Sequence, residues 1–203
     1  MAVIFGTQGR DTLPGTDQDD VIRGWAADGD PATDLGDRLS GLGGDDKLSG
    51  GGGDDLLVGG DGDDTLAGGD GDDRLGGFNG ADQLLGGNGS DQLSGGGGAD
   101  VLAGGAGPDQ LEGGGGADLL FGGGGRDSFD FRRGYDMDTI LDFKDDVDTL
   151  ELGSSLGVTS RSEALSRAEV VDGDTVFAFD TGDVLVVENI ADPNLLRDDI
   201  YIV

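Results

Sequence analysis

A nine-residue pattern repeats without interruption from Gly41 to Asp130 and limits what the chain can fold into. Ten consecutive units have Gly at positions 1 and 4, Asp at position 6 and an apolar residue at position 8. The first unit reads Gly-Leu-Gly-Gly-Asp-Asp-Lys-Leu-Ser, and the last reads Gly-Gly-Gly-Gly-Arg-Asp-Ser-Phe-Asp. A disordered Gly-rich linker does not keep an apolar residue in the same frame ten times, and collagen requires Gly at every third position. The pattern therefore indicates a stack of identical structural units.

Each unit is long enough for one tight turn and one short strand. The Gly-rich half supplies backbone positions with positive φ. The last three residues are expected to be extended, so that positions 7 and 9 face one way and position 8 the other. Stacking then buries one column of position-8 side chains between two parallel sheets: Leu48, Leu57, Leu66, Leu75, Leu84, Leu93, Leu102, Leu111, Leu120 and Phe129. The sequence thus predicts an all-β solenoid.

Looser versions of the unit precede the regular ones. Residues Ala2–Phe5 form a short apolar stretch that is expected to be a leading strand. Two units follow at Gly6–Pro14 and Gly15–Arg23, and the second has Gln18 where the pattern has Gly at position 4. Both keep the Asp of position 6, so we expect the stack to begin here.

An insertion interrupts the early units at residues 24–40. This stretch is a nonapeptide with eight additional residues, and it restores the frame at Asp37. It contains the only tryptophan, Trp25, and three acidic residues, namely Asp28, Asp30 and Asp34. Two interpretations stay open: a projecting loop that binds a further cation or a partner, or a surface insertion in which Trp25 covers an open end of the core.

The repeat stops after residue 130. Of the 45 glycines, 40 precede this point and five follow it. Ser160 and Glu163 form a capping box before a short helix that is expected to run to about Ala168, and Pro193 is expected to start one helical turn. Alternation with period two predicts strands at Asp127–Phe131, Asp138–Phe143, Val147–Leu152, Thr175–Phe179 and Val184–Ile190. We therefore expect a β-rich segment that caps the stack.

Charge and composition exclude several classes of function. The net charge of −31 argues against nucleic acid and anionic membrane surfaces as partners, and no apolar run is long enough for membrane insertion. The chain has no Cys and no His, which rules out disulfides, thiolate sites, His-ligated zinc and a Ser-His-Asp triad. Gly153–Gly157 matches the G-x-S-x-G pattern of a nucleophile elbow. Without His as a base, it is interpreted as a loop.

The regular units resemble the haemolysin-type calcium-binding repeats of the RTX (repeats-in-toxin) family. The resemblance extends over about 90% of the chain, since the C-terminal segment resembles those that close the rolls of RTX proteases. It implies a parallel β-roll in which two nonapeptides make one turn, so that units two apart stack about 4.8 Å from each other. One buried side chain per nine residues does not offset the conformational entropy of a Gly-rich unit, so bound metal is expected to hold the turns.

The family implies which residues hold calcium. The Asp at position 6 supplies a carboxylate, and the loop glycines supply carbonyl oxygens, a donor set that suits Ca²⁺. The expected carboxylate ligands are Asp11, Asp20, Asp37, Asp46, Asp55, Asp64, Asp73, Asp82, Asp91, Asp100, Asp109, Asp118 and Asp127. The expected carbonyl ligands are at Gly51, Gly53, Gly60, Gly62, Gly69, Gly71, Gly87, Gly89, Gly96, Gly98, Gly105, Gly107, Gly114, Gly116, Gly123 and Gly125.

The charge of the repeats agrees with many bound cations. Residues 6–130 carry 26 acidic and 6 basic side chains, a net charge of −20. One ion between each pair of stacked loops gives about 8 to 11 Ca²⁺, which would nearly cancel that charge. Without metal the chain is expected to repel itself and stay open.

Two functions are considered. The first is a non-enzymatic, monomeric, extracellular bacterial protein that leaves the cell through a type I ABC exporter and folds on Ca²⁺ outside. The division is then residues 1–130 as the β-roll and residues 131–203 as the cap, with Asp198–Val203 resembling the uncleaved C-terminal signal of type I substrates. The N-terminal residues Met1–Phe5 lack the basic and long apolar regions of a cleavable signal peptide.

The alternative is a carbohydrate-binding or enzyme-associated module. Within the family, similar rolls accompany alginate epimerases, lipases and proteases. An acidic polysaccharide would need a basic stripe on one sheet face. The outward positions 7 and 9 offer Arg23, Arg38, Lys47 and Arg74 early in the array.

Overall fold

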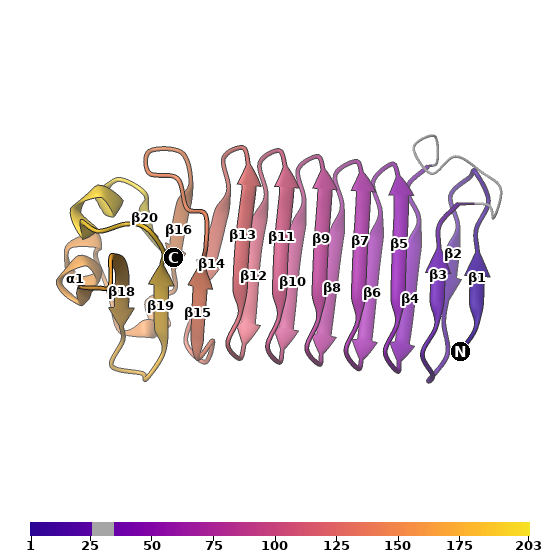
Figure 1. The fold of residues 1–203 in the computed structure, drawn as a ribbon, viewed down its shortest axis with the longest axis horizontal. Helices are drawn as coiled ribbons and strands as arrows, with labels where there is room; N and C mark the ends of the chain where they lie inside the picture. Colours follow the sequence, from indigo (N-terminus) through magenta and orange to yellow (C-terminus); the bar gives the residue numbers. More distant parts are fainter. Residues whose placement is uncertain (26–34) are drawn as a thin grey trace.

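The computed structural model describes residues 1–25 and 35–203, and it has the shape of an elongated parallel β-roll (Figure 1). Its strands divide between an 11-stranded and a 9-stranded sheet that face each other. From β1 to β16 the chain alternates between the sheets at every strand, so that successive nonapeptides lie in opposite sheets. The predicted all-β parallel roll is confirmed. Asp28, Asp30 and Asp34 of the insertion lie outside the described residues.

The 11-stranded sheet, called here the odd sheet, contains the odd-numbered strands of the roll and continues into the cap. In spatial order it consists of β1 (Val3–Phe5), β3 (Val21–Arg23), β5 (Lys47–Gly52), β7 (Thr65–Asp70), β9 (Gln83–Asn88), β11 (Val101–Ala106), β13 (Leu119–Gly124), β15 (Met137–Ile140), β19 (Val184–Val187), β18 (Asp174–Ala178) and β17 (Ala168–Val171). All pairs are parallel up to β19, and β19, β18 and β17 pair antiparallel.

The 9-stranded sheet, called here the even sheet, is parallel throughout. It consists of β2 (Thr12–Pro14), β4 (Arg38–Gly43), β6 (Leu56–Asp61), β8 (Arg74–Asn79), β10 (Gln92–Gly97), β12 (Gln110–Gly115), β14 (Ser128–Phe131), β16 (Thr149–Leu152) and β20 (Ile200–Ile202). Neighbouring strands of the regular array are 18 residues apart in sequence: Leu75 of β8 pairs with Leu57 and with Leu93. Two nonapeptides therefore make one turn.

The core is the predicted column of position-8 side chains. Each of the ten is at most 3% exposed, and the column continues into the cap through Ile140 and Leu150, which are fully buried. The residues on either side of it in each strand are exposed or half-buried. This alternation follows from the pleat of an extended strand.

The strands are longer than the three residues expected from the sequence. From β4 to β13, each strand covers six residues, from position 7 of one unit to position 3 of the next. Leu66 pairs with Leu84, and in the same strands Gly69 pairs with Gly87. The ladder continues through the glycines because their backbone bonds do not depend on a side chain. The turn proper is confined to positions 4 to 6.

The C-terminal segment covers one end of the roll. Ser160 caps helix α1 (Arg161–Ser166), accepting a hydrogen bond on its hydroxyl from the Glu163 amide. The helix was expected to reach Ala168, but Ala168 opens β17 and pairs with Phe177, so the sheet ends the helix early. The 3₁₀ turns η2 (Ser154–Leu156) and η3 (Pro193–Arg197) complete the cap, and the predicted turn at Pro193 is confirmed.

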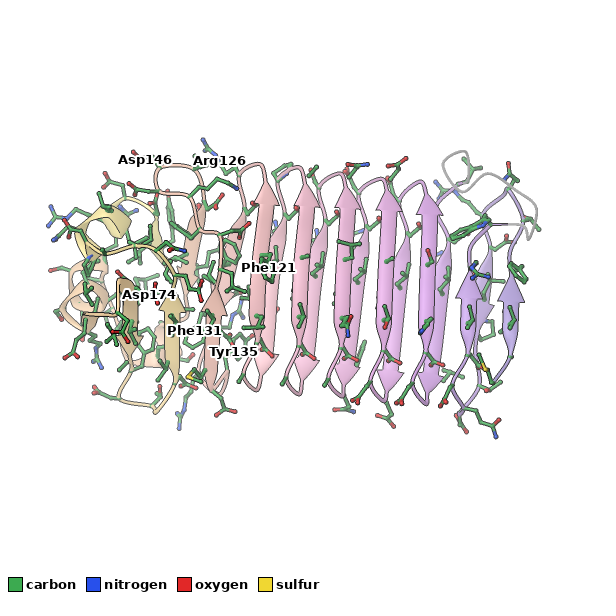
Figure 2. The ribbon with its side chains drawn as sticks, viewed as in Figure 1. Phe121, Arg126, Phe131, Tyr135, Asp146 and Asp174 are labelled. Atoms are coloured by element: carbon green, nitrogen blue, oxygen red, sulfur yellow. The ribbon has the colours of Figure 1, made fainter. Side chains whose placement is uncertain are left out.

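Aromatic side chains close the core where the repeats meet the cap. The rings of Phe131 and Tyr135 lie close together, and both are labelled in Figure 2. Their centroids are 5.9 Å apart, edge to face, and the ring of Phe179 lies 5.8 Å from Phe131. Phe129 and Phe131 are almost fully buried. Phe129 has the place of the repeated leucine, and Phe131, two residues later in the same strand, adds a second ring to the core. None of the helices in residues 1–25 and 35–203 is long and apolar enough to cross a membrane.

Candidate metal-binding loops

The position-6 aspartates form two columns, one along each edge where the chain crosses between the sheets. One column contains Asp11, Asp37, Asp55, Asp73, Asp91, Asp109, Asp127 and Asp148. The other contains Asp20, Asp46, Asp64, Asp82, Asp100, Asp118 and Asp138. The fold thus brings carboxylates that are far apart in sequence into neighbouring loops.

One oxygen of each carboxylate except that of Asp11 is bonded to the backbone of the preceding loop or strand. Asp11 is the first of its column, and its Oδ2 accepts hydrogen bonds from the amide and the hydroxyl of Thr7 in its own loop, at 2.6 and 2.9 Å. Oδ1 of Asp82 accepts a hydrogen bond from the amide of Asp64 at 2.8 Å, and Oδ1 of Asp64 accepts one from the amide of Asp46 at 2.8 Å. The bond recurs down both columns at 2.6–3.2 Å. It fixes the side chain at the point where two loops face each other.

The second oxygen of most of these carboxylates has no hydrogen-bond partner. Within the described residues, Oδ2 is buried and unpaired at Asp46, Asp64, Asp73, Asp82, Asp91, Asp100, Asp109, Asp118, Asp127 and Asp138. A buried polar atom without a partner is costly, and a recurring one requires an explanation. A cation shared between successive loops is the explanation that the family resemblance implies.

Glycines leave room around these oxygens. A Cβ atom at Gly68, position 1, would overlap Oδ2 of Asp73. A Cβ atom at Gly71, position 4, would overlap the carbonyl oxygen of Gly53 in the preceding loop, and Gly71 also has a φ of +132°. The glycines therefore allow the carboxylate oxygen and the loop carbonyl to point into the space between loops.

The donor set consists of oxygen atoms only. Among the described residues, no group of three or more acidic side chains is close enough to hold a metal by itself. The loops instead combine a carboxylate oxygen from position 6 with backbone carbonyls from the glycines. Such flexible oxygen-rich sites suit Ca²⁺, whereas Mg²⁺ requires a tighter octahedral arrangement. The residues present therefore fit calcium.

Burial changes the acidity of the columns. It raises the pKa of Asp64, Asp73, Asp100 and Asp109 to about 7, because the charged form loses its hydration and neighbouring carboxylates of the same column repel it. For Asp138, burial and the Asp118 carboxylate raise the pKa as well. Without a cation, the columns thus store unfavourable electrostatic energy.

Position-5 aspartates form an outer layer in the first regular units. Oδ1 of Asp63 accepts a hydrogen bond from the Ala81 amide at 2.8 Å, and Oδ1 of Asp54 accepts one from the Asp72 amide at 3.1 Å. These side chains are exposed, unlike those of position 6. They tie neighbouring loops together from outside.

The cap contributes a built-in cation at the last regular loop. The ammonium of Lys144 donates a hydrogen bond to the carbonyl oxygen of Gly123, and the Asp142 carboxylate accepts from the amides of Gly122 and Gly123, each at 2.8 Å. Oδ2 of Asp148 accepts from the Lys144 amide at 2.9 Å. Side chains of the cap therefore bond the backbone of Gly122 and Gly123 in this loop.

Asp138 and Asp148 were not among the predicted site residues. Both continue the columns, because Oδ1 of Asp138 bonds the Asp118 amide at 3.2 Å and Oδ1 of Asp148 bonds the Asp127 amide at 3.0 Å. Their sequence signal is an Asp two residues before a buried apolar residue, as in Asp138-Thr139-Ile140. The glycines of the turn are missing there, which hid the pattern.

The four basic residues of the outward positions do not form one stripe. Arg38 and Arg74 lie on the even sheet in β4 and β8, with Leu56 between them. Arg23 and Lys47 lie on the odd sheet in β3 and β5. The expected basic surface for an acidic polysaccharide is therefore divided between opposite faces.

A protein-family model matches most of the chain. The family described as RTX calcium-binding nonapeptide repeat (4 copies) matches residues 3–28, 32–66, 58–93, 76–111, 94–129 and 104–137. These segments include all ten regular units and the looser units before them. No curated protein matches the chain.

Fourteen chains of solved structures match the fold. One of them is the crystal structure of the extracellular lipase LipA from Serratia marcescens, with a TM-score of 0.51 and 18% sequence identity. The match covers 95% of this chain and 40% of the lipase chain, so the chain spans about two-fifths of that enzyme's length. At this identity, the likeness concerns the fold alone.

Proposed function

The chain belongs to the family of RTX calcium-binding nonapeptide repeats, and we propose from this premise that it is a secreted, non-enzymatic protein whose roll folds when calcium binds. The observation that carries the proposal is the recurring unpaired Oδ2 in both aspartate columns. Each lies beside glycines that leave space for an ion, and the surrounding donors are all oxygen atoms.

We assign the carboxylate role to the thirteen predicted position-6 aspartates, and add Asp138 and Asp148, which occupy equivalent places at the cap. The loop glycines at positions 2 and 4 provide carbonyl oxygens. Bound calcium would supply the positive charge that the buried carboxylates lack. About 8 to 11 ions were expected for the repeats, one between each pair of stacked loops.

Folding outside the cell follows from the same charges. In a cytosol poor in free Ca²⁺, the −20 of residues 6–130 is uncompensated, and a self-repelling chain stays open enough for an exporter. Outside, the free energy of calcium binding becomes free energy of folding. A monomeric, extracellular bacterial protein handled by a type I ABC exporter is the setting that this proposal requires.

Circular dichroism tests the calcium part. In EDTA the purified protein should lose most of its β signal, and Ca²⁺ should restore it cooperatively with a midpoint of about 10⁻⁴–10⁻³ M, the range of extracellular modules. The same concentration of Mg²⁺ is the control and should restore little. A β signal that chelation leaves unchanged, or that both ions restore equally, contradicts the proposal.

The export part needs point variants rather than a truncation. Ile200 is fully buried, and β20 pairs with β16, so removing Asp198–Val203 would damage the fold as well as any signal. Asp198 and Tyr201 are exposed. Asp198→Ala with Tyr201→Ala should reduce export from a host with a type I exporter, whereas Glu169→Ala with Val170→Ala on edge strand β17 should not. Normal export of the first variant would show that these residues only cap the roll.

A second candidate is an enzyme-associated module, of the kind that accompanies a lipase, a protease or an alginate epimerase. The likeness to two-fifths of an extracellular lipase favours it. Under this proposal the chain stabilises or targets a catalytic partner and still needs calcium. Co-purification of a hydrolase or epimerase activity with the folded chain from its native host would support it over the stand-alone function.

A further inference from the structure

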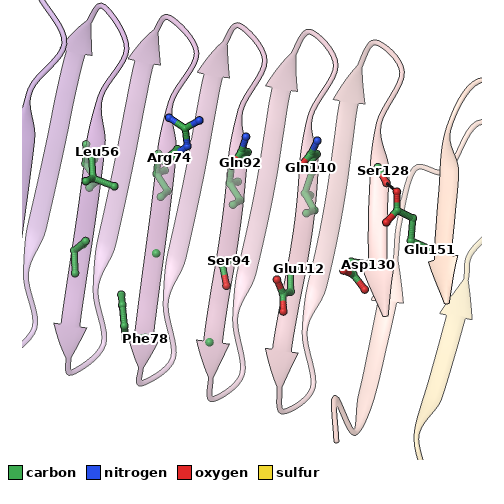
Figure 3. A pocket seen from close by; sticks show the side chains of 17 residues that line it. Leu56, Arg74, Phe78, Gln92, Ser94, Gln110, Glu112, Ser128, Asp130 and Glu151 are labelled. Carbon is green, nitrogen blue, oxygen red and sulfur yellow. Dashed lines mark hydrogen bonds between the residues drawn. The ribbon is translucent and has the colours of Figure 1, made fainter. Parts of the chain in front are cut away.

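A groove of about 770 Å³ runs across the outer face of the even sheet, away from the two aspartate columns (Figure 3). It begins at β6 and extends over β8, β10, β12 and β14 to Glu151 of β16. The groove crosses the strands, so it follows the long axis of the roll. Of the residues that line it, Gly96 is the one that also belongs to the proposed calcium ligands, through its backbone carbonyl, and none of the position-6 aspartates is among them.

Two parallel rows of side chains border the groove. The strand register aligns Leu56, Arg74, Gln92, Gln110 and Ser128 in one row, and Val58, Gly76, Ser94, Glu112 and Asp130 in the other. Figure 3 shows both rows stepping from strand to strand. Small residues at Gly76 and Ser94 make the floor of the middle part.

Phe78 forms a wall of the groove at a conformational cost. It occupies position 2, which is Gly in eight of the ten regular units, and its φ is +81°. A bulky residue in this region is an outlier that costs stability. Its ring is not used for the core, since the residue is 56% exposed and lies beside Gly76. An exposed, strained aromatic residue at the rim of a groove points to a ligand that the ring contacts.

The polar groups of the middle part are free. In the part of the chain that the structure describes, the side chains of Arg74, Gln92 and Gln110 have no hydrogen bond or ion pair. The acidic end differs, because its carboxylates have partners. Tyr135 donates to Glu112, Arg132 pairs with Asp130, and Ser128 donates to Glu151 at 3.2 Å.

We propose that this groove binds a neutral, linear polysaccharide along the axis of the roll. Amides and hydroxyls both donate and accept hydrogen bonds, as sugar hydroxyls do, and Phe78 offers a face for the apolar side of a pyranose ring. Strands lie about 4.8 Å apart, a distance close to the length of one pyranose unit, so successive sugars would meet successive strands.

Other occupants fit less well. A peptide advances about 3.3 Å per residue and binds sheets through strand edges, whereas this groove lies on a face. An acidic polysaccharide would meet the carboxylates of Glu112, Asp130 and Glu151, whereas Arg74 is the one basic side chain among the described residues that line the groove. The charge therefore selects a neutral glycan over an acidic one.

Calorimetry on the folded, calcium-loaded protein tests the proposal with defined probes: cellohexaose, laminarihexaose and xylohexaose as neutral glycans, a chondroitin sulfate hexasaccharide as the acidic one, and hexalysine as a peptide. We expect at least one neutral glycan to bind. Phe78→Gly should weaken that binding about tenfold or more while leaving the fold as stable or more stable, since it restores the repeat residue. Gln92→Ala with Gln110→Ala should weaken it as well.

Two matched controls share the local structure without lining the groove. Leu42 has the same position in its unit, a φ of +78° and 49% exposure, so Leu42→Gly should change stability but not binding. Gln83 occupies position 7 on the odd sheet, and Gln83→Ala should have no effect on binding. The proposal is overturned if no neutral glycan binds, if Phe78→Gly binds like the wild type, or if the acidic glycan or hexalysine binds more tightly. Circular dichroism on the same samples separates these outcomes from a failure of calcium-dependent folding.

Discussion

At the scale of single residues, the position-6 carboxylate does two things at once. One oxygen bonds the backbone of the adjacent loop and thereby holds the side chain inside the turn. At Asp64, as at most of these aspartates in the described residues, the other oxygen is buried without a hydrogen-bond partner and is available to an ion. At Asp11 and Asp20 that oxygen instead accepts from the hydroxyls of Thr7 and Thr16. The position-5 carboxylate beside it also bonds a neighbouring backbone amide, but it is exposed. The position-5 and position-6 aspartates of one loop therefore differ mainly in burial, so the same substitution in each shows what the buried carboxylate contributes.

Asp64→Asn and Asp63→Asn separate the two roles. Both changes keep an oxygen for the backbone bond and remove one negative charge. Asp64→Asn replaces a buried ligand oxygen, so it should lower the free energy of unfolding in calcium by about 1.5–3 kcal/mol. Asp63→Asn should change it by less than about 0.5 kcal/mol. Denaturant unfolding in excess Ca²⁺ measures both, and equal losses would contradict the assignment of position 6.

The pH dependence of stability in the metal-free protein provides a second test of the buried carboxylates. Asp64, Asp73, Asp100 and Asp109 have a folded pKa of about 7, above the ordinary value of 3.8 that applies when unfolded. Between these values the folded state binds protons that the unfolded state does not, so its stability increases as the pH falls from about 7 towards 4. Protons replace part of the missing positive charge.

Circular dichroism in EDTA over this range checks the prediction. The β signal or the melting temperature should rise on acidification, with most of the change between pH 7 and pH 5. Calcium affinity should fall over the same range, because protons compete for the carboxylates. A change centred near pH 4 would instead indicate ordinary surface carboxylates and would disprove the role of the buried ones.

At the scale of elements, the nonapeptide frame predicted where each regular strand begins and which side chain it buries. The length of the strands could not be predicted from the frame. The strand Lys47–Gly52 continues for three glycine residues, because its backbone pairs with that of β7, 18 residues later in the sequence. No side-chain pattern reveals these backbone bonds. In the cap, the alternating pattern located β14, β16 and β19. It missed β17, which exists only because β18 pairs with it.

Lys144 links the cap to the last regular loop and gives a prediction at this scale. The chain contains only two lysines, and the other, Lys47, is exposed on β5. Lys144→Met removes the ammonium that bonds the Gly123 carbonyl, and should lower stability by about 0.5–1 kcal/mol in limiting calcium. Lys47→Met is the matched control and should have little effect. Thermal melts at low Ca²⁺ compare the two variants. An equal change in melting temperature would show that the bond from Lys144 to the Gly123 carbonyl does not stabilise the fold.

At the scale of the whole molecule, the roll is a stack whose two edges carry repeated buried charge. The sequence sufficed for this architecture and for placing thirteen aspartates in the turns; their role as calcium ligands stays a prediction. It did not reveal Asp138 and Asp148, because the spacing in the columns changes there from 18 to 20 and 21 residues. The groove around Phe78 was also missed, since its rows combine side chains from strands that only the register aligns.

The separation of the columns along opposite edges follows from two units per turn. Every loop of one column faces only loops of the same column, so ions should bind in two parallel rows with no exchange between them. The charge of residues 6–130, −20, is large enough to involve nearly every loop. The central claim is therefore positional: calcium lies between successive position-6 aspartates along both edges.

Crystals grown in calcium, with anomalous diffraction recorded at a long wavelength, test that claim most directly. About 8 to 11 anomalous peaks are expected from the repeats, in two rows, each within about 2.3–2.6 Å of a position-6 carboxylate oxygen and of loop carbonyls. Further peaks beside Asp138 or Asp148 would extend the rows into the cap. Peaks confined to the exposed position-5 aspartates, or the absence of ordered peaks between the loops, would contradict it.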